Sequence, residues 1–236
     1  MRRPLTFLIT AGPTVEDLDP VRFISNRASG QLGFEIARAA LAARHRVILI
    51  HGPVAEELVR SLPRVPSARL QRVAVRSCAQ MHRAVLKALP RTDVVVMTAA
   101  VADFAPARTS AVKLKKRATG LVLRLRPTVD ILAHLGRIKR ARRPDLVLVG
   151  FALETGSGRT PAARARARLR EARRKLVAKN LDAIVLDTPA EMASARGAFH
   201  VLRAGTEQVR TFRANKREFA GRLLRITEGG TRRRGK

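Results

Sequence analysis

The segment of residues 9–33 holds the densest set of groups that could bind an anion. Gly30 and Gly33 allow close approach of the backbone to a ligand, and a helix that begins there would point its first N–H groups at a negative charge. Arg22 adds a guanidinium that can clamp a carboxylate or phosphate, and Asn26 adds an amide that both donates and accepts. The same pattern fits an ordinary strand-to-helix crossover with a solvated Arg22, so the segment alone leaves both interpretations open.

A second candidate segment is TAAVADF, residues 98–104. Its small residues, Ala99 and Ala100 among them, leave room for a ligand. Asp103 follows a predicted strand end, where its carboxylate could hold a metal ion or the edge of a base. The alternative is a tight turn in which Asp103 caps a helix.

Two pairs of lysines could neutralise phosphate charge. In KLKK, strand alternation puts Lys113 and Lys115 on one side, and a mobile hairpin carrying them could close over a triphosphate. An edge strand protected from aggregation by lysines is the alternative. Lys175 and Lys179 are one helical turn apart and share a face, which could also be a plain basic surface.

Several common catalytic motifs are absent from the sequence. It contains no GxxxxGK[ST] loop and no GxSxG elbow. Cys78 stands in no local catalytic signature, and the five histidines have no metal-ligand spacing. The sequence therefore leaves the ligands of any metal ion unknown.

The elements that must position these residues alternate along the chain. Near-continuous apolar runs, typical of buried parallel strands, are separated by helical patterns. The predicted strands are 5–10, 47–51, 70–75, 93–98, 146–151 and 183–186, and the predicted helices are 33–44, 78–89, 130–140 and 161–179. This order predicts an α/β fold: a Rossmann-like, doubly wound, mostly parallel sheet with helices on both faces.

Two segments break the alternation. Residues 112–126 and 199–212 each show period-two patterning around a turn signal and are predicted as β-hairpins, the first as an inserted flap. A last helix is predicted over 216–226. We expect one nucleotide-binding domain over residues 1–228 and a basic, disordered tail over 229–236.

Composition narrows the class of protein further. The chain has 236 residues, of which 46% are hydrophobic, and its formal net charge is +30. Such a charge attracts polyanions, but only 3% of residues are aromatic, which argues against repeated base stacking. A single cysteine excludes a disulfide framework, and no apolar run approaches the roughly 20 residues of a spanning helix. We expect a cytoplasmic protein without a membrane partner.

The order of these motifs resembles that of phosphopantothenate–cysteine ligases, the phosphopantothenoylcysteine synthetases of coenzyme A biosynthesis. The matching segments are ITAGPT, DPVR, ISNRASGQLG, AAVADF, KLKK, VDI, GFALET and the K-x-x-x-KN-x-D pattern that begins at Lys175. The resemblance extends to about Ile226. The sequence departs from the family pattern at Ala28, Gln31, Val129 and Asp187.

The resemblance implies an amide ligase. In the family, the carboxylate of 4′-phosphopantothenate attacks the α-phosphate of CTP (ATP in most eukaryotic members), and L-cysteine then attacks the acyl-nucleotide. Pyrophosphate and a nucleoside monophosphate are released, and Mg²⁺ is required. Family members are commonly homodimers with a shared site. The likeness begins directly at the ligase's first strand, so we expect a stand-alone ligase served by a separate decarboxylase.

The resemblance also implies roles for individual residues. Asn26 and Lys113 would be catalytic, with Asn26 holding the acyl group and Lys113 stabilising phosphate charge. Arg22, Ala99 and Ala100 would bind the phosphopantothenate substrate. The residues implied to contact the nucleotide are Ala99, Asp103, Lys113, Thr128, Val129, Asp130, Ile131, Phe151, Lys175 and Lys179.

Two other functions are weighed against the ligase. An NAD(P)-dependent Rossmann reductase would need a GxGxxG turn after its first strand, which this sequence lacks. A non-catalytic protein that binds nucleic acid through its basic surface would tolerate loss of Lys113 or Asn26. It is disfavoured by the scarcity of aromatic residues and the lack of a recognised nucleic-acid-binding motif.

Overall fold

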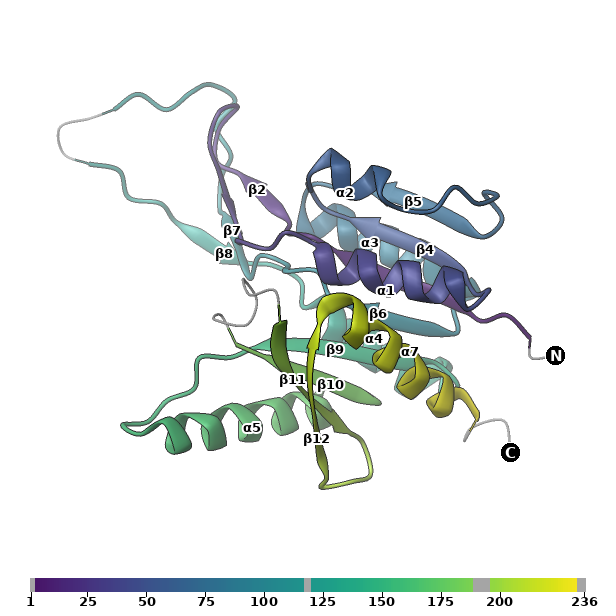
Figure 1. Cartoon of the computed structure of the whole chain (residues 1–236). Helices are drawn as coiled ribbons and strands as arrows, with labels where there is room; N and C mark the ends of the chain where they lie inside the picture. Colours follow the sequence, from purple (N-terminus) through teal and green to yellow (C-terminus); the bar gives the residue numbers. More distant parts are fainter. Residues whose placement is uncertain (1–2, 117–119, 189–195, 233–236) are drawn as a thin grey trace.

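Eight strands form one sheet in this computed structural model, which describes residues 3–116, 120–188 and 196–232 (Figure 1). The spatial order is β12-β11-β10-β9-β6-β1-β4-β5. The strands are β1 (Thr6–Ala11), β4 (Arg46–His51), β5 (Leu70–Ala74), β6 (Val94–Met97), β9 (Val147–Leu153), β10 (Ala183–Asp187), β11 (Arg196–Arg203) and β12 (Val209–Asn215). The first six are mutually parallel, and β11 and β12 are antiparallel. This confirms the predicted doubly wound, mostly parallel sheet.

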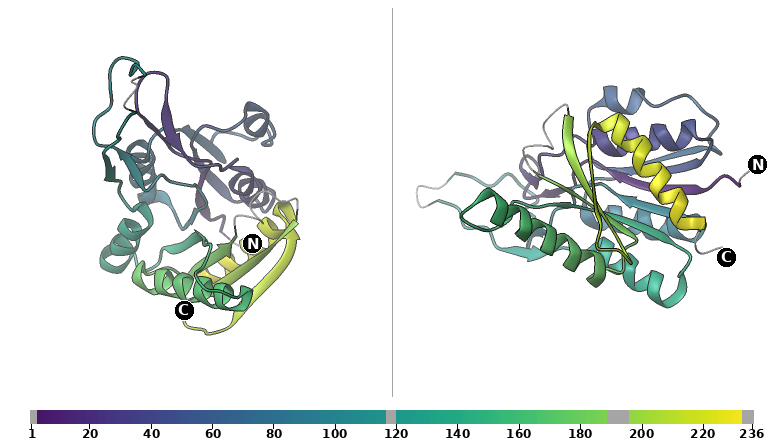
Figure 2. Two further views of the ribbon diagram at one scale, coloured as in Figure 1. Left: turned by 90° about the vertical axis from the view of Figure 1, so that its left-hand side faces the viewer. Right: turned by 60° about the horizontal axis from the view of Figure 1, so that its bottom comes forward.

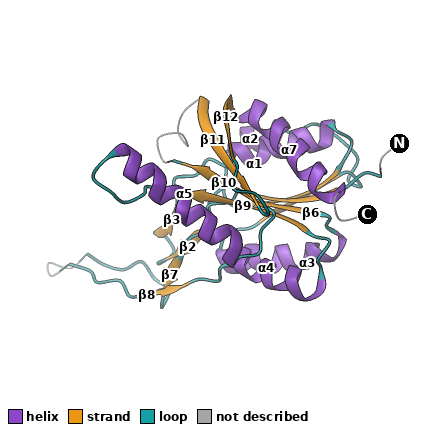
Figure 3. Ribbon diagram, turned by 90° about the horizontal axis from the view of Figure 1, so that it is seen from below, coloured by secondary structure: helices purple, strands orange, loops and turns teal. Residues whose placement is uncertain are grey.

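Helices cover both faces of the sheet (Figure 3). One face carries α1 (Gln31–Ala42), α2 (Glu56–Arg60) and α7 (Lys216–Arg232). The other carries α3 (Cys78–Ala88), α4 (Ile131–Arg142) and α5 (Pro161–Ala178), with a short 3₁₀ turn, η1 (Leu89–Arg91), after α3. Because both faces are covered, the central strands bury nearly every side chain, which explains their unbroken apolar runs.

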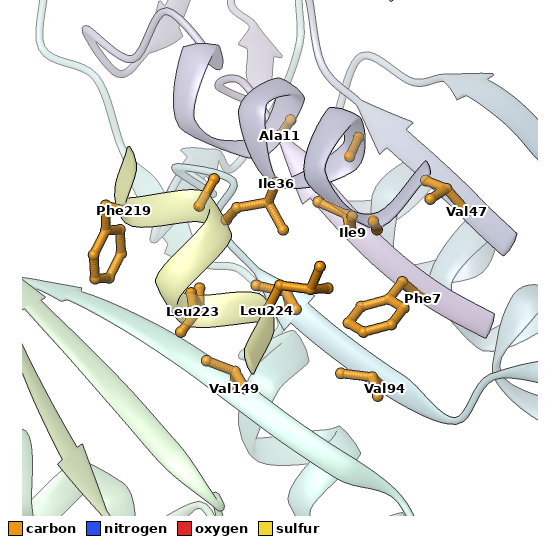
Figure 4. Close-up of a cluster of buried hydrophobic side chains, with 14 of the residues drawn as sticks. Phe7, Ile9, Ala11, Ile36, Val47, Val94, Val149, Phe219, Leu223 and Leu224 are labelled. Carbon is orange, nitrogen blue, oxygen red and sulfur yellow. The ribbon is translucent and has the colours of Figure 1, made fainter. Parts of the chain in front are cut away.

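The core on the α1 side joins the first and last thirds of the chain (Figure 4). Ile36 of α1 and Leu223 of α7 lie over Ile9 and Val149 of the sheet, and all four are at most 1% exposed. Full burial of each such aliphatic side chain stabilises the fold by roughly 1.5–3 kcal/mol. The C-terminal helix is thereby fixed against the strands that carry the cleft described below.

Residues 104–116 and 120–127, called the arm below, project from the body of the protein (Figures 1 and 2). Strand pairing is confined to the base of the arm, where β7 (Phe104–Pro106) pairs with β8 (Leu125–Pro127). Of the hairpin predicted over residues 112–126, only Leu125 and Arg126 are in a strand, and their partner is β7 rather than residues 112–115; the described residues 112–116 and 120–124 form no strand. Alternation specifies a strand only when one face is buried, and here Val112 and Val122 are 71% and 90% exposed.

The second predicted hairpin is confirmed, since β11 and β12 pair antiparallel. It has a buried face because Phe199 and Phe212 pack on Phe219 of α7. A small antiparallel pair that the sequence did not signal, β2 (Val15–Asp17) and β3 (Phe23–Ser25), lies beside the arm.

The last helix is longer than predicted. It extends to Arg232, so residues 229–232 are helical and the tail predicted over 229–236 begins too early. Thr227 is buried, and a hydrogen bond of 2.9 Å joins His45 Nε2 to Glu228 Oε1, so this helix is held against the body of the protein. Residues 233–236 lie outside the described part of the chain. Within that part, none of the helices has the length and apolarity to cross a membrane.

Candidate active site

A cleft of about 610 Å³ opens at the carboxyl ends of the parallel strands. It lies where the strand order reverses, because β1 has β4 on one side and β6 on the other. Open α/β sheets bind ligands at this switch point, and the volume is in the range of about 300–1,000 Å³ that is usual for ligand sites. The walls come from residues 26–33, 97–101, 103, 128–132 and 151–153, together with Lys175, Lys179, Asp187 and Lys216.

The start of α1 forms one wall of the cleft. Gly30 has a φ of +81° and precedes the helix without a side-chain cap. The Gln31 N–H donates to Ser29 Oγ at 3.4 Å, and helix geometry leaves the next N–H groups, those of Leu32 and Gly33, without an intrahelical acceptor. A Cβ on Gly33 would lie 2.6 Å from both Ala11 Cβ and Thr98 Oγ1, which shows how closely α1 packs on the ends of β1 and β6. The positive end of this helix is therefore held at the cleft, where it favours an anion.

Asn26 and the loop after β6 meet across the cleft. The Nδ2 group of Asn26 donates to the carbonyl oxygen of Ala100 at 3.0 Å. The Ala100 N–H donates to the carbonyl of Gly12 at 2.9 Å, so this loop is tied to the end of β1. The structure thus brings Asn26, Ala99 and Ala100 to one place, as the sequence predicted.

Lys175 and Lys179 line the opposite wall, and each is paired with a carboxylate. Lys175 Nζ lies 2.6 Å from Glu154 Oε1, and Lys179 Nζ lies 2.7 Å from Asp130 Oδ2. These contacts hold two ammonium groups at the cleft. An incoming phosphate can replace the carboxylates as their hydrogen-bond partner.

Asp130 also caps α4, because its Oδ1 accepts from the Ala133 N–H at 2.9 Å. Burial alone would raise its pKa, but the hydrogen bonds from Lys179 and Ala133 outweigh this, and the pKa of Asp130 is lowered. The Asp130 carboxylate is therefore ionised at neutral pH and attracts the Lys179 side chain to its side.

Three charged residues that line the cleft, Arg27, Asp187 and Lys216, were not assigned a role from the sequence. Glu154, which pairs with Lys175, was not assigned one either, although it belongs to the GFALET segment that matches the family pattern. Lys216 begins α7, and its Nζ lies 3.3 Å from Gln31 Oε1. Asp187, at the end of β10, was noted only as a departure. Lys216 could not be placed from sequence because it reaches the cleft through the packing of α7 on α1.

Most of the predicted site residues are gathered in this cleft. Those that line it are Asn26, Ala99, Ala100, Asp103, Thr128, Val129, Asp130, Ile131, Phe151, Lys175 and Lys179.

Arg22 does not line the cleft. It forms a two-point contact with Asp19 at 3.0 and 2.5 Å and donates to the carbonyl of Leu114 at 2.7 Å. This guanidinium, together with backbone N–H donors, holds the pKa of Asp19 well below its usual range. Arg22 therefore connects Asp19 to Leu114 of the arm rather than facing the cleft.

Lys113 also lies outside the cleft, on the exposed part of the arm. Its implied role at the phosphates stays a prediction, and it requires the arm to move or a second subunit to supply Lys113.

Metal-ligating side chains do not gather in the described residues: no group of three or more His, Cys, Asp or Glu could hold a metal ion there. His82 and His134 form an isolated pair, 2.8 Å apart between α3 and α4.

The strand order, the cleft at the switch point and its lysines place the chain among the doubly wound, Rossmann-like α/β proteins that bind ligands at the carboxyl ends of their strands. Residues 3–229 match the model of one particular family, described as the DNA/pantothenate metabolism flavoprotein C-terminal domain. The chain belongs to this family.

Two named relatives are similar to three quarters of the chain. The chain is 43% identical over 178 residues to the coenzyme A biosynthesis bifunctional protein CoaBC of Bacillus subtilis, covering 75% of this chain and 39% of the relative. It is also 43% identical over 180 residues to a cysteine/cysteine sulfinic acid decarboxylase from an unknown prokaryotic organism, covering 76% of this chain and 45% of that relative. The chain thus spans less than half the length of these relatives.

A solved structure shares the whole architecture. The crystal structure of the C-terminal domain of a CoaBC protein superposes with a TM-score of 0.72 at 32% identity, covering 95% of this chain and 94% of that one. The match therefore extends over nearly the whole chain.

Proposed function

We propose that this protein is a phosphopantothenate–cysteine ligase that acts in coenzyme A biosynthesis. The observation that carries the proposal is the gathering of Asn26, Asp103 and the Lys175–Lys179 pair around one cleft at the switch point of the sheet. Relatives named for coenzyme A biosynthesis support the same pathway. A reductase has no comparable support, because the turn after β1 lacks the GxGxxG pattern.

The proposed reaction has two balanced steps. A carboxylate oxygen of 4′-phosphopantothenate attacks the α-phosphorus of CTP, the bond from that phosphorus to the bridging oxygen breaks, and pyrophosphate leaves. The amine nitrogen of L-cysteine then attacks the acyl carbon, CMP leaves with the phosphate oxygen, and the amine loses a proton. The products are pyrophosphate, CMP and 4′-phosphopantothenoylcysteine.

Both phosphate-bearing substrates are anions, so the cleft must offset their repulsion. Lys175, Lys179 and the start of α1 are the groups we assign to the triphosphate, with Phe151 and residues 128–131 beside the nucleoside. Asn26, with Ala99 and Ala100, would hold the acyl group. Mg²⁺ typically keeps several waters and binds through substrate phosphates and one or two carboxylates, which suits this donor set.

Lys113 completes the proposed site from the arm. The arm exposes Val112, Leu121 and Val122, which are 71%, 54% and 90% accessible, and apolar surface of this kind favours contact with another chain. We propose a homodimer in which the arm of one subunit brings Lys113 toward the cleft of its partner, where it stabilises charge as the α-phosphate is attacked.

The test is pyrophosphate release by the purified protein. It is measured with 4′-phosphopantothenate, Mg²⁺ and either CTP or ATP, with and without L-cysteine. We expect release that depends on phosphopantothenate, amide product only with cysteine, and faster turnover with CTP.

Lys179→Gln is expected to lower this rate about 10²-fold or more, because it removes a cation at the phosphates. Arg170→Gln is the matched control, since Arg170 is exposed on the same helix outside the cleft. No release with either nucleotide from folded protein refutes the ligase, and equal rates for both variants refute the assignment of Lys179.

A further inference from the structure

The backbone of Ala102 is held at both its N–H and its carbonyl by threonine hydroxyls. Thr14 Oγ1 accepts from the Ala102 N–H at 2.9 Å, and Thr128 Oγ1 donates to the Ala102 carbonyl at 2.5 Å. Ala102 is only 5% exposed, so neither backbone group can turn to water instead. Asp103, which faces the cleft, is the next residue along the chain.

Thr14 connects this backbone to the rest of the cleft. Its side chain is fully buried, its N–H donates to the Ala100 carbonyl at 3.2 Å, and its own carbonyl accepts from Ser25 Oγ at 2.8 Å. The Ala100 carbonyl also accepts from Asn26. One residue thus joins the segment that carries Asn26 to the segment that carries Asp103.

We infer that Thr14 is a positioning residue for nucleotide binding: its hydroxyl fixes the Ala102 peptide and thereby the place of Asp103. The inference rests on the proposed function for the identity of the ligand. Thr14 does not line the cleft, so it acts only through Ala102. Thr128 binds the carbonyl of the same residue but lines the cleft itself, so its substitution would change both the Ala102 backbone and the cleft wall.

The experiment compares side chains that keep or lose the hydroxyl at nearly constant shape. Thr14→Val removes the acceptor and keeps the branching, while Thr14→Ser and Thr14→Ala form a second pair that differ only in the hydroxyl. The control is Thr92→Val, which removes a buried threonine hydroxyl, bonded to the Ala88 carbonyl at 2.9 Å, at the other end of β6.

Three quantities are measured: the Kd of the Mg²⁺–CTP complex by calorimetry, the separate KM values for CTP and phosphopantothenate, and hydrogen exchange of the Ala102 amide. We expect Thr14→Val and Thr14→Ala to weaken CTP about tenfold, with the KM for phosphopantothenate within about twofold. The Ala102 amide should exchange at least about tenfold faster in both. Thr14→Ser and Thr92→Val should bind CTP within about threefold of the unmodified protein.

The inference is overturned if Thr14→Ser is as impaired as Thr14→Ala, since the hydroxyl would then be irrelevant. It is also overturned if Thr92→Val weakens CTP equally, or if all variants bind as the unmodified protein does. If Thr14→Val fails to fold, the serine and alanine variants decide the question. If the unmodified protein binds no nucleotide, the proposed function fails by itself, and exchange at Ala102 still shows whether the hydroxyl holds that peptide.

Discussion

Replacing either of two helical glycines with alanine should change the stability of the protein, but in opposite directions. Gly136 of α4 packs against the turn after α5, and a Cβ placed on it would lie 1.9 Å from the carbonyl oxygen of Lys179. A carbon atom needs about 3.5 Å from a non-bonded neighbour, so the two backbones would have to separate by roughly 1.6 Å. Gly221 of α7 has nothing within 4 Å of the same position.

Helix propensity alone predicts that both substitutions stabilise the protein. Alanine is favoured over glycine within a helix by roughly 0.5–1 kcal/mol, and that gain is expected for Gly221→Ala. At Gly136 the clash opposes it, and overpacking against a fixed backbone destabilises by about 3 kcal/mol. For a domain of this size, about 3 kcal/mol lowers Tm by roughly 6–12 °C.

The Gly136 clash also bears on the cleft, because the displaced backbone is that of Lys179. Lys179 Nζ reaches Asp130 at 2.7 Å, and Asn180 Nδ2 donates to the Gly136 carbonyl at 3.3 Å. We therefore expect Gly136→Ala to weaken nucleotide binding as well as lower Tm. Thermal unfolding followed by circular dichroism, together with nucleotide titration, measures both effects. A Gly136→Ala protein that is as stable as Gly221→Ala would refute the reasoning.

Three more predictions concern the arm and the buried thiol. Lys113→Gln should lower kcat about 10²–10³-fold while Tm changes by less than about 1 °C, since Lys113 is exposed; normal turnover in a pyrophosphate assay would contradict its proposed role. Asp19 has a pKa that is lower in the folded state than in the unfolded one, so its carboxylate stabilises the fold above about pH 4, and that contribution is lost as the pH falls further. Asp19→Asn should lower the urea midpoint at neutral pH, and the gap to the unmodified protein should close below about pH 4; a gap independent of pH would argue against this. Burial raises the pKa of the Cys78 thiol, so iodoacetamide should label this sole cysteine in urea but not in the native protein, whereas rapid native labelling would show that the site is open.

The two predicted hairpins show where sequence patterning succeeds and where it fails. Both segments alternate apolar and polar residues around a turn signal. Only the second has a partner, because α7 covers Phe199 and Phe212, and it forms β11 and β12. In the arm, Leu121 and Leu123 remain 54% and 40% exposed, and the described residues there pair only at β7 and β8. Local alternation carries no information about whether another element will cover it.

The parallel sheet and part of the cleft follow from the sequence. Continuous apolar runs require cover on both faces, and the carboxyl ends of parallel strands meet at one edge, so Asn26 and Asp103 could be expected together. Lys179 precedes β10 rather than following a strand, and its place at the cleft was implied only by the family resemblance. Tertiary structure alone decided which charges face one another. Lys216 reaches the cleft only because α7 packs on α1, and Arg22 turns away to Asp19 and Leu114. Side-chain pairing depends on distances between segments far apart in the chain, and periodicity within one segment cannot encode those distances.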